Sequence, residues 1–201
     1  MSAGRRSALV PAAQVPPLMM VTARAVASHE SPDNGSNGVG AVLPMLDGVS
    51  PRVALLTPEL EPEWHVASDR GRPLEERLQA FEDILDSEVG DTTLTRARNL
   101  EREVGLRQIF LKFDGGNPTG TQKDRIAFAQ TMDALRRGYD TITVATCGNY
   151  GVALSLAASI AGLRCLLYLP TGYHTRRVHE MQRYGAMILR AGEDYESAVA
   201  A

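Results

Sequence analysis

The chain reads Gly115-Gly116-Asn117-Pro118-Thr119-Gly120-Thr121-Gln122-Lys123-Asp124-Arg125 between a strand-like apolar run, residues 109–113, and an amphipathic segment, residues 126–137. Glycines and a proline at this density predict a turn, because neither residue type continues a strand or a helix well. Lys123 then falls at the expected start of the helix. The positive end of the helix dipole disfavours a second positive charge there, which favours the neutral amine. A neutral lysine amine is a nucleophile that forms a Schiff base with an aldehyde.

Two other interpretations of this run compete. The first is a solvated lysine near a helix start, without any chemical role. The second is a phosphate-binding P-loop, for which Gly115 and Gly120 have the required spacing. That motif needs a lysine directly after its second glycine, where this chain has Thr121, and Lys123 comes two residues too late. The spacing excludes the P-loop and leaves the surface lysine as the alternative.

A second motif follows the next strand-like run. Residues 143–146 read as the end of a buried strand, and the chain then continues through Cys147-Gly148-Asn149-Tyr150-Gly151 into an apolar helical run, residues 152–161. Backbone N–H groups at the start of a helix bind anions, so a carboxylate or a phosphate suits this turn. The competing interpretation is a plain strand-to-helix turn that contains glycine for steric reasons.

In this order and separation, the two motifs resemble those of the fold type II pyridoxal-phosphate enzymes, the tryptophan synthase β-subunit type, and most of all their threonine synthase-like branch. The resemblance extends from Gly90 to about Ala201. Residues 117–125 match the family's Asn-Pro-x-Gly-Ser-x-Lys-Asp-Arg motif, with Thr121 in place of serine. Residues 146–151 match its Ser-Ser/Cys-Gly-Asn-x-Gly motif, and residues 91–95 match its Thr-Pro-Leu entry segment loosely.

The resemblance implies that the cofactor is pyridoxal 5'-phosphate and gives particular residues their roles. Lys123 would hold the cofactor as a Schiff base and, once freed, would be the catalytic base at the substrate's α-carbon. Asn149 would contact the phenolic oxygen of the cofactor. The residues implied to bind the substrate carboxylate are Thr146, Cys147, Gly148, Asn149 and Tyr150. No residue is expected to bind a metal.

The implied reaction is that of a lyase that acts on an amino acid by elimination or replacement at the β- or γ-carbon. Threonine synthesis from phosphohomoserine is the first expectation. Cysteine synthase-like replacement and threonine dehydratase-like elimination are the alternatives. Gln122 stands where threonine synthases tend to have phenylalanine, and this departure leaves the identity of the substrate open.

By the same resemblance, a glycine-rich loop for the cofactor phosphate and the residue that faces the pyridine nitrogen lie far downstream of the asparagine motif. This sequence has no later glycine-rich run. We therefore expect either the N-terminal part of a catalytic core, a core completed by a second chain, or a non-catalytic paralogue. An incomplete parallel sheet is also expected to expose an apolar edge and to aggregate, and the chain alone is expected to bind the cofactor weakly.

The composition is that of a soluble globular protein, with 201 residues, 44% hydrophobic and 22% charged residues and a net charge of −3. This charge gives no reason to expect nucleic acid or an anionic membrane as a partner, and no apolar run has the length of a membrane span. Cys147 and Cys165 fall in different expected elements, which favours free thiols in a reducing, cytoplasmic compartment. The expected partners are an amino-acid substrate and either a second copy in a homodimer or a completing chain.

Two regions differ in their patterning. Residues 1–50, rich in Pro, Gly, Ser and Ala, predict a disordered tail or linker, and residues 51–201 predict the incomplete catalytic core. A helix is expected to start at Pro73, and a short one is expected to be capped by Thr95 and stopped by Gly105.

From residue 108 onward, strands and helices alternate through short glycine-marked turns. This alternation predicts an α/β fold in which a parallel sheet is flanked by helices in three layers. Ligands of such sheets bind at the carboxyl ends of the strands, where the asparagine motif is expected. The expected strands are residues 108–113, 141–146, 164–169 and 186–190, and the expected helices are residues 122–137, 152–161, 175–184 and 195 onward.

Overall fold

A mostly parallel sheet forms the centre of the protein. The computed structural model describes residues 42–43, 58–146 and 148–200. Strands β4 (Thr141–Ala145), β5 (Arg164–Leu169) and β6 (Met187–Arg190) pair in parallel, and β1 (Val42–Leu43) pairs antiparallel with β6 at the edge, in the order β1-β6-β5-β4. The prediction of a parallel sheet within an α/β fold is confirmed.

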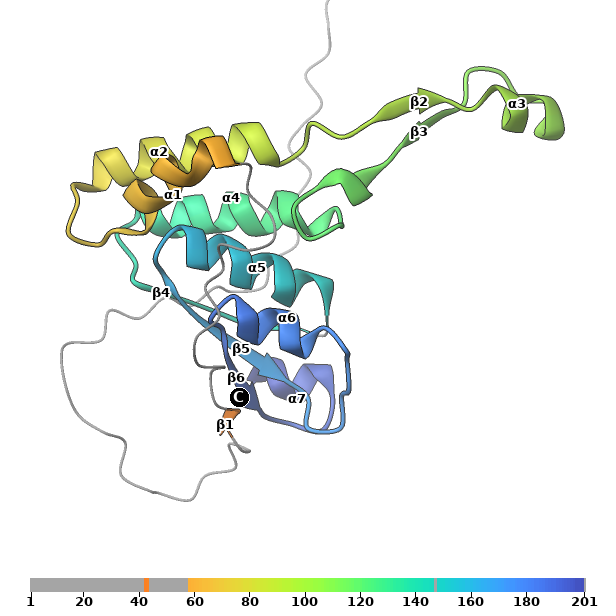
Figure 1. Cartoon of the computed structure of the whole chain (residues 1–201). Coiled ribbons are helices and arrows are strands. Elements are labelled where there is room, and N and C mark those ends of the chain that lie inside the picture. The colour runs from red at the N-terminus through yellow and green to blue at the C-terminus, as the bar shows by residue number, and fades with distance from the viewer. Residues whose placement is uncertain (1–41, 44–57, 147, 201) are drawn as a thin grey trace, which may run out of the picture.

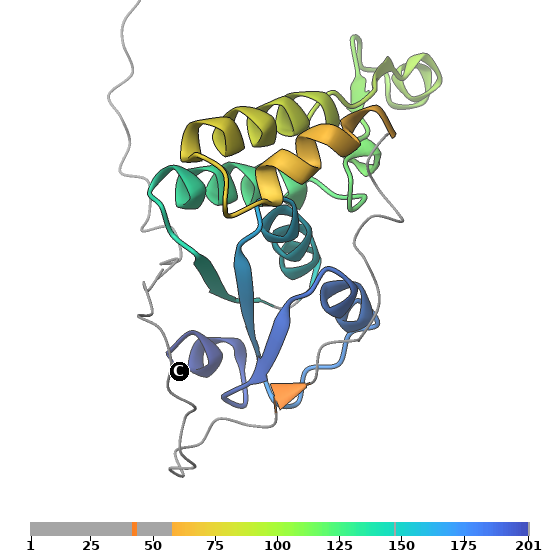
Figure 2. The same ribbon diagram turned by 60° about the vertical axis from the view of Figure 1, so that its left-hand side comes forward.

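Helices cover both faces of this sheet. On one side α5 (Asn149–Ile160) packs against β5, α4 (Lys123–Arg136) packs against α5, and α2 (Leu74–Glu88) packs against α4. The layers can be followed in Figure 1, where α1 (Glu61–Ser68) lies beside α2. Figure 2 shows α6 (Val178–Arg183) and α7 (Tyr195–Ala200) on opposite sides of the strands.

The apolar character of α5 follows from its place between the sheet and α4. Nearly every residue from Gly151 to Ile160 is buried, and a helix that is apolar on all sides is stable only when all its sides are covered. The outer layer is joined to this core by Phe81 of α2 and Phe128 of α4, whose rings stack with centroids 5.8 Å apart. Trp64 of α1 packs against the same core.

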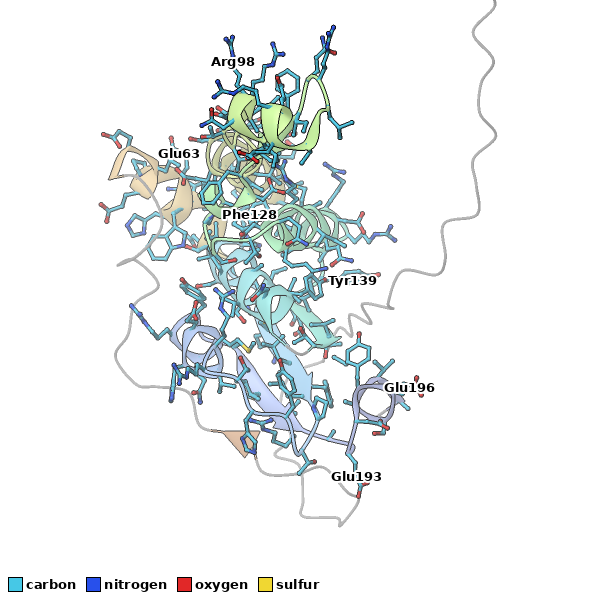
Figure 3. All side chains as sticks on the ribbon, turned by 90° about the vertical axis from the view of Figure 1, so that its right-hand side faces the viewer. Glu63, Arg98, Phe128, Tyr139, Glu193 and Glu196 are labelled. Carbon is cyan, nitrogen blue, oxygen red and sulfur yellow. The ribbon has the colours of Figure 1, made fainter. Side chains whose placement is uncertain are left out.

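One part of the chain projects away from these layers, and we call residues 91–113 the arm. It consists of β2 (Leu94–Arg96), α3 (Arg98–Val104) and β3 (Phe110–Lys112), with β2 and β3 paired antiparallel. Figure 1 shows the arm reaching outward beyond α2 and α4. In Figure 3, Arg98 marks its outer end, on the far side of the molecule from Glu193 and Glu196.

The expected N-cap at Thr95 is wrong. Thr95 lies in β2, opposite Leu111 of β3, and the residue that precedes α3 is Ala97. Thr95 lies in the sheet because it pairs with Leu111, sixteen residues further along the chain, and local capping signals do not reveal such a contact. The other end of α3 is as expected, because Gly105 follows it with φ of 67°, a conformation that glycine adopts without strain.

Several element boundaries also differ from expectation. Helix α5 begins at Asn149 instead of residue 152, so Asn149 and Tyr150 belong to its first turn. Helix α6 begins at Val178 instead of residue 175, and residues 170–177 are a loop. Residues 42–43 form strand β1, so the expectation of a tail without structure is wrong for them, while residues 1–41 and 44–50 lie outside the described residues.

No helix in the described part of the chain combines the length and the apolar character that crossing a lipid bilayer requires.

Candidate active site

Asp124, the residue that follows Lys123, holds the turn before α4 together. The carboxylate of Asp124 is fully buried and accepts hydrogen bonds from the backbone N–H of Thr119 (3.2 Å), from its hydroxyl (2.8 Å) and from the N–H of Thr121 (3.4 Å). The N–H of Lys123 donates in turn to the hydroxyl of Thr121 at 3.2 Å. These contacts fold the turn back on the helix start and place Lys123 as the first residue of α4.

Two further residues of the same motif tie the turn to the segment that enters the arm. The amide of Asn117 accepts from the N–H of Gly90 and donates to the carbonyl of Asp114, both at 2.9 Å. Arg125 donates to the carbonyl of Gly90 at 3.1 Å and to the Asp114 carboxylate at 2.8 Å. The Arg125 hydrogen bond is the main cause that lowers the pKa of Asp114. Asn117, Asp124 and Arg125 therefore shape the turn that presents Lys123.

The asparagine turn is equally constrained. Thr146, directly after β4, is buried, and its N–H donates to the carbonyl of Tyr168 at 3.0 Å. Gly148 has φ of 154°, a value that side chains with a Cβ rarely adopt. At Gly151, an added Cβ would lie 2.7 Å from Cγ2 of Thr146 and 2.9 Å from Cε of Met181. Glycine at these two positions allows α5 to start close to the end of β4.

The two turns meet at one cleft. It has a volume of about 450 Å³, which lies in the range of small-molecule sites. It is found where β4 and β5 end, the edge at which open α/β sheets bind ligands. Of the residues singled out in the sequence, it brings together Lys123, Thr146, Gly148, Asn149 and Tyr150. Cys147, which was assigned to the same site, lies outside the described residues.

Three lining residues were not foreseen. Tyr173, Thr175 and Arg177 come from the loop that follows β5 and complete the wall of the cleft. Arg177 falls within the helix expected over residues 175–184, but it precedes α6 and lies half-buried. Because parallel strands end at the same edge of a sheet, the loop after β5 had to face the loop after β4. That rule was the signal in the sequence that could have found these residues.

Arg177 makes the largest number of polar contacts in the cleft. Its guanidinium donates to Oδ1 of Asn149 at 2.7 Å, to the carbonyl of Thr119 at 3.0 Å and to both carboxylate oxygens of Glu180 at 3.0 and 2.8 Å. The bond to Glu180 is the main cause that raises the pKa of Arg177. One side chain therefore connects the lysine turn, the asparagine turn and α6.

Tyr150 contributes to the cleft wall with its ring. Its hydroxyl donates a hydrogen bond to Oε1 of Gln130 on α4, and burial raises the pKa of this phenol. The hydroxyl is therefore directed at α4. Tyr150 fixes the spacing between the first turn of α5 and α4.

The donor set of the cleft fits pyridoxal 5'-phosphate. Lys123 is exposed, and within residues 58–146 and 148–200 its amine has no hydrogen bond or ion pair, so it is available to an aldehyde. The Asn149 amide and the hydroxyls of Thr146 and Thr175 supply polar groups for an oxygen-rich ring. Within the described residues, no group of three or more His, Cys, Asp or Glu side chains is arranged to hold a metal.

A cleft that joins the lysine turn before α4 to the asparagine turn after β4 is the arrangement expected of cofactor-dependent enzymes that hold an aldehyde through a lysine. A sequence model of the pyridoxal-phosphate dependent enzymes matches residues 85–201, more than half of the chain. The chain therefore belongs to the pyridoxal-phosphate dependent enzyme family, and the cofactor of that family is pyridoxal 5'-phosphate.

Individual relatives carry different activities in their names. Cysteine synthase B of Pseudomonas syringae pv. syringae is 36% identical over 110 residues, which are 53% of this chain and 64% of that protein. Threonine synthase of Methanocaldococcus jannaschii is 30% identical over 111 residues, 55% of this chain and 27% of that protein. Cystathionine beta-synthase of Apis mellifera is 33% identical over 113 residues, 54% of this chain and 22% of that protein. The chain thus spans less than two thirds of the length of these relatives.

A solved structure supports the fold. The crystal structure of a pyridoxal 5'-phosphate-dependent aspartate racemase superimposes with a TM-score of 0.53 at 23% sequence identity, covering 61% of this chain and 39% of that chain. At this identity the likeness concerns the arrangement of strands and helices alone.

Proposed function

We propose that the protein acts, with pyridoxal 5'-phosphate, as a lyase that eliminates or replaces a group at the β- or γ-carbon of an amino acid. The observation that carries this proposal is the cleft itself. Its wall joins Lys123, from the turn before α4, to Thr146, Gly148 and Asn149, from the turn after β4. When bound, the cofactor delocalises the negative charge that develops at the α-carbon of the amino acid.

Lys123 has two tasks in this proposal. Its amine would hold the cofactor through the aldehyde group, and when it is not so engaged it would take the proton from the α-carbon of the substrate. The side chain begins at the first residue of α4 and has no polar partner among the described residues. It is therefore free to move between these two positions without breaking another contact.

The start of α5 binds the carboxylate of the substrate. Helix α5 has twelve residues, and the N–H groups of its first turn, which follows Gly148, are not all used within the helix. Such groups, together with the dipole of the helix, favour a negative charge. Thr146 and Tyr150 bound the same place, and we assign Cys147 to it by the resemblance of residues 146–151 to the family motif. Asn149 orients the ring of the cofactor.

Two substrates remain in competition. Threonine synthase-like action on phosphohomoserine is supported by the motif resemblance and by the relative from Methanocaldococcus jannaschii. Cysteine synthase-like replacement is supported by the relative from Pseudomonas syringae at 36% identity. Both chemistries begin with removal of the α-proton by Lys123, and the difference lies in the groups that meet the side chain of the substrate. Threonine dehydratase-like elimination has no relative among those described above.

We also propose that a second copy of this chain or a completing chain takes part in cofactor binding. A non-catalytic paralogue is the alternative.

The compartment we propose is the cytoplasm. Cys165, the one free cysteine among the described residues, is buried, and burial raises the pKa of its thiol to about 12. An inert thiol of this kind is compatible with that compartment.

A titration with pyridoxal 5'-phosphate followed by a substrate panel tests the proposal. The protein is mixed with phosphohomoserine, O-acetylserine plus sulfide, serine or threonine, and release of phosphate, acetate, ammonia and keto acid is measured. We expect weak but saturable cofactor binding and one preferred substrate, and both should be lost in Lys123→Arg. Binding without turnover of any substrate would favour the non-catalytic paralogue, and the absence of saturable binding would overturn the proposal.

A further inference from the structure

We propose that Arg177 is a positioning residue that fixes the orientation of the Asn149 side-chain amide, so that its NH₂ group is presented to the cofactor. The inference rests on the function proposed above, because it concerns the contact of Asn149 with a bound ring. It assigns a task to Arg177, which neither the lysine motif nor the asparagine motif contains. The starting observation is the hydrogen bond from the Arg177 guanidinium to Oδ1 of Asn149 at 2.7 Å.

The direction of this bond follows from the chemistry of the two groups. A guanidinium has donors and no acceptor, whereas an asparagine amide has an acceptor oxygen on one side and a donor NH₂ on the other. A hydrogen bond with Arg177 is therefore possible only in the orientation in which the oxygen of Asn149 points toward the guanidinium. The NH₂ group then points the other way, and within residues 58–146 and 148–200 it has no hydrogen-bond partner.

Arg177 is itself held in place. Its Nε and Nη2 donate to the two oxygens of Glu180, and Nη2 also donates to the carbonyl of Thr119. A two-point contact between a guanidinium and a carboxylate fixes the plane of the guanidinium as well as its position. The buried Asp124 carboxylate adds a further negative charge on the side of the lysine turn. The guanidinium is thus oriented before any ligand arrives.

The consequence concerns binding of the ring. The phenolic oxygen of the cofactor is a hydrogen-bond acceptor, so it needs the donor side of Asn149. Without Arg177, the amide of an exposed asparagine rotates between its two orientations, and one of them places an oxygen against the oxygen of the ring. Arg177 removes that orientation, and the cofactor meets a donor that is already in place. Because the same arginine contacts Thr119, the donor is also held at a fixed position relative to the turn that carries Lys123.

Four variants test this assignment in the full chain. Arg177→Met removes the donors and keeps the aliphatic stem. Asn149→Asp keeps an oxygen for Arg177 but has no donor for the ring. Asn149→Ala removes both. Arg176→Met is the matched control, because Arg176 is an exposed neighbour outside the cleft lining. For each variant, the dissociation constant of pyridoxal 5'-phosphate and the thermal midpoint of the cofactor-free protein are measured.

We expect Arg177→Met to weaken cofactor binding about twofold or more, up to the effect of losing one hydrogen bond, because the Asn149 amide then also adopts the wrong orientation, while Arg176→Met leaves binding unchanged. Asn149→Asp should weaken binding at least as much as Asn149→Ala, yet its cofactor-free midpoint should equal or exceed that of the wild type, because Arg177 then faces a charged partner. Combining Arg177→Met with Asn149→Ala should weaken binding no more than Asn149→Ala alone, since both act on one contact.

Different results overturn different statements. If the wild type binds the cofactor and Asn149→Ala weakens binding, but Arg177→Met binds like the wild type, the assignment of Arg177 is wrong and the proposed function stands. If Arg177→Met fails to fold, Asn149→Asp decides alone: wild-type affinity in that variant contradicts the assignment. If the wild type shows no saturable binding, the proposed function fails and the assignment fails with it.

Discussion

The carboxylate of Asp124 accepts hydrogen bonds from both the backbone N–H and the hydroxyl of Thr119, at 3.2 and 2.8 Å, while it is fully buried. The acid next to Lys123 in sequence therefore faces away from the cleft and closes the turn from within. Burial raises the pKa of Asp124, and the hydrogen bonds from Thr119 and Thr121 oppose that shift only in part. This relationship gives the first prediction.

Asp124→Asn should lower the free energy of unfolding by about 1–3 kcal/mol, because the amide NH₂ group would face N–H and O–H donors. The pH dependence should change as well. A folded pKa above the unfolded value means that the native state holds the proton more tightly, so the stabilisation is present below the unfolded pKa and is lost as the pH rises through the folded pKa. The part of the pH dependence of the unfolding free energy that comes from Asp124 should be absent in Asp124→Asn. Denaturant unfolding between about pH 3.5 and 7 measures both effects.

Asp86→Asn, a change at an exposed position of α2, is the matched control and should retain the wild-type slope. An unaltered slope in Asp124→Asn would show that the Asp124 carboxyl has the same pKa in the folded and unfolded chains.

Asn149→Ala should separate cofactor binding from folding. The side chain of Asn149 is exposed, and its partner Arg177 keeps Glu180 and Thr119 when the amide is removed. We expect the thermal midpoint of the cofactor-free chain to stay within a degree or two, and cofactor binding to weaken by about 0.5–1.5 kcal/mol. Calorimetry and an absorbance titration measure the two quantities. A large loss of cofactor-free stability would mean that Asn149 is structural.

Gly151→Ala should disturb the cleft through packing alone. The new methyl group would meet the side chains of Thr146 and Met181 at 2.7 and 2.9 Å, so these side chains or the first turn of α5 have to shift. Overpacking of this kind costs about 1–3 kcal/mol, and the shift should weaken cofactor binding at the same time. Gly172→Ala is the control, because an added Cβ there meets nothing within 4 Å. Equal thermal midpoints for the two variants would refute the steric argument.

The parts of the site that are local in sequence could be predicted. Lys123 at a helix start and Asn149 at the turn after a strand both follow from glycine placement and from the switch between strand and helix patterning. Their shared place in one cleft follows from the resemblance and from the rule that ligands bind where parallel strands end. The roles of the individual residues in binding remain predictions.

The rest depends on contacts that are distant in sequence. Arg177 is 28 residues from Asn149 and 58 from Thr119, and nothing near it in the sequence signals either contact. In the sequence, Thr95 has the pattern of a helix N-cap, and only the pairing of β2 with β3 shows that it lies in a strand. Helix α5 begins at Asn149, three residues before its apolar run. The apolar pattern does not reveal this start because Asn149 and Tyr150 carry polar groups.

The arm should govern self-association of the isolated chain. Leu94 and Phe110 are 62% and 54% exposed, and every residue of β2 and β3 is exposed. Exposed apolar strands pair with other chains. Changing Leu94 and Phe110 together to serine should raise the monomeric fraction in size-exclusion chromatography with light scattering. Val199→Ser, an equally exposed change on α7, should not. If the arm variant associates as strongly as the wild type, another surface drives the association.

The most direct measurement concerns Lys123. The sequence contains only two lysines, and the other, Lys112, already donates to the carbonyls of Thr92 and Gly90 at 2.5 and 3.4 Å. The chain is mixed with pyridoxal 5'-phosphate, reduced with borohydride and mapped by peptide mass spectrometry. We predict that the cofactor is fixed on Lys123, that Lys112→Arg does not change this, and that Lys123→Arg abolishes it. Labelling of Lys112 or of the α-amine in place of Lys123 would contradict the account.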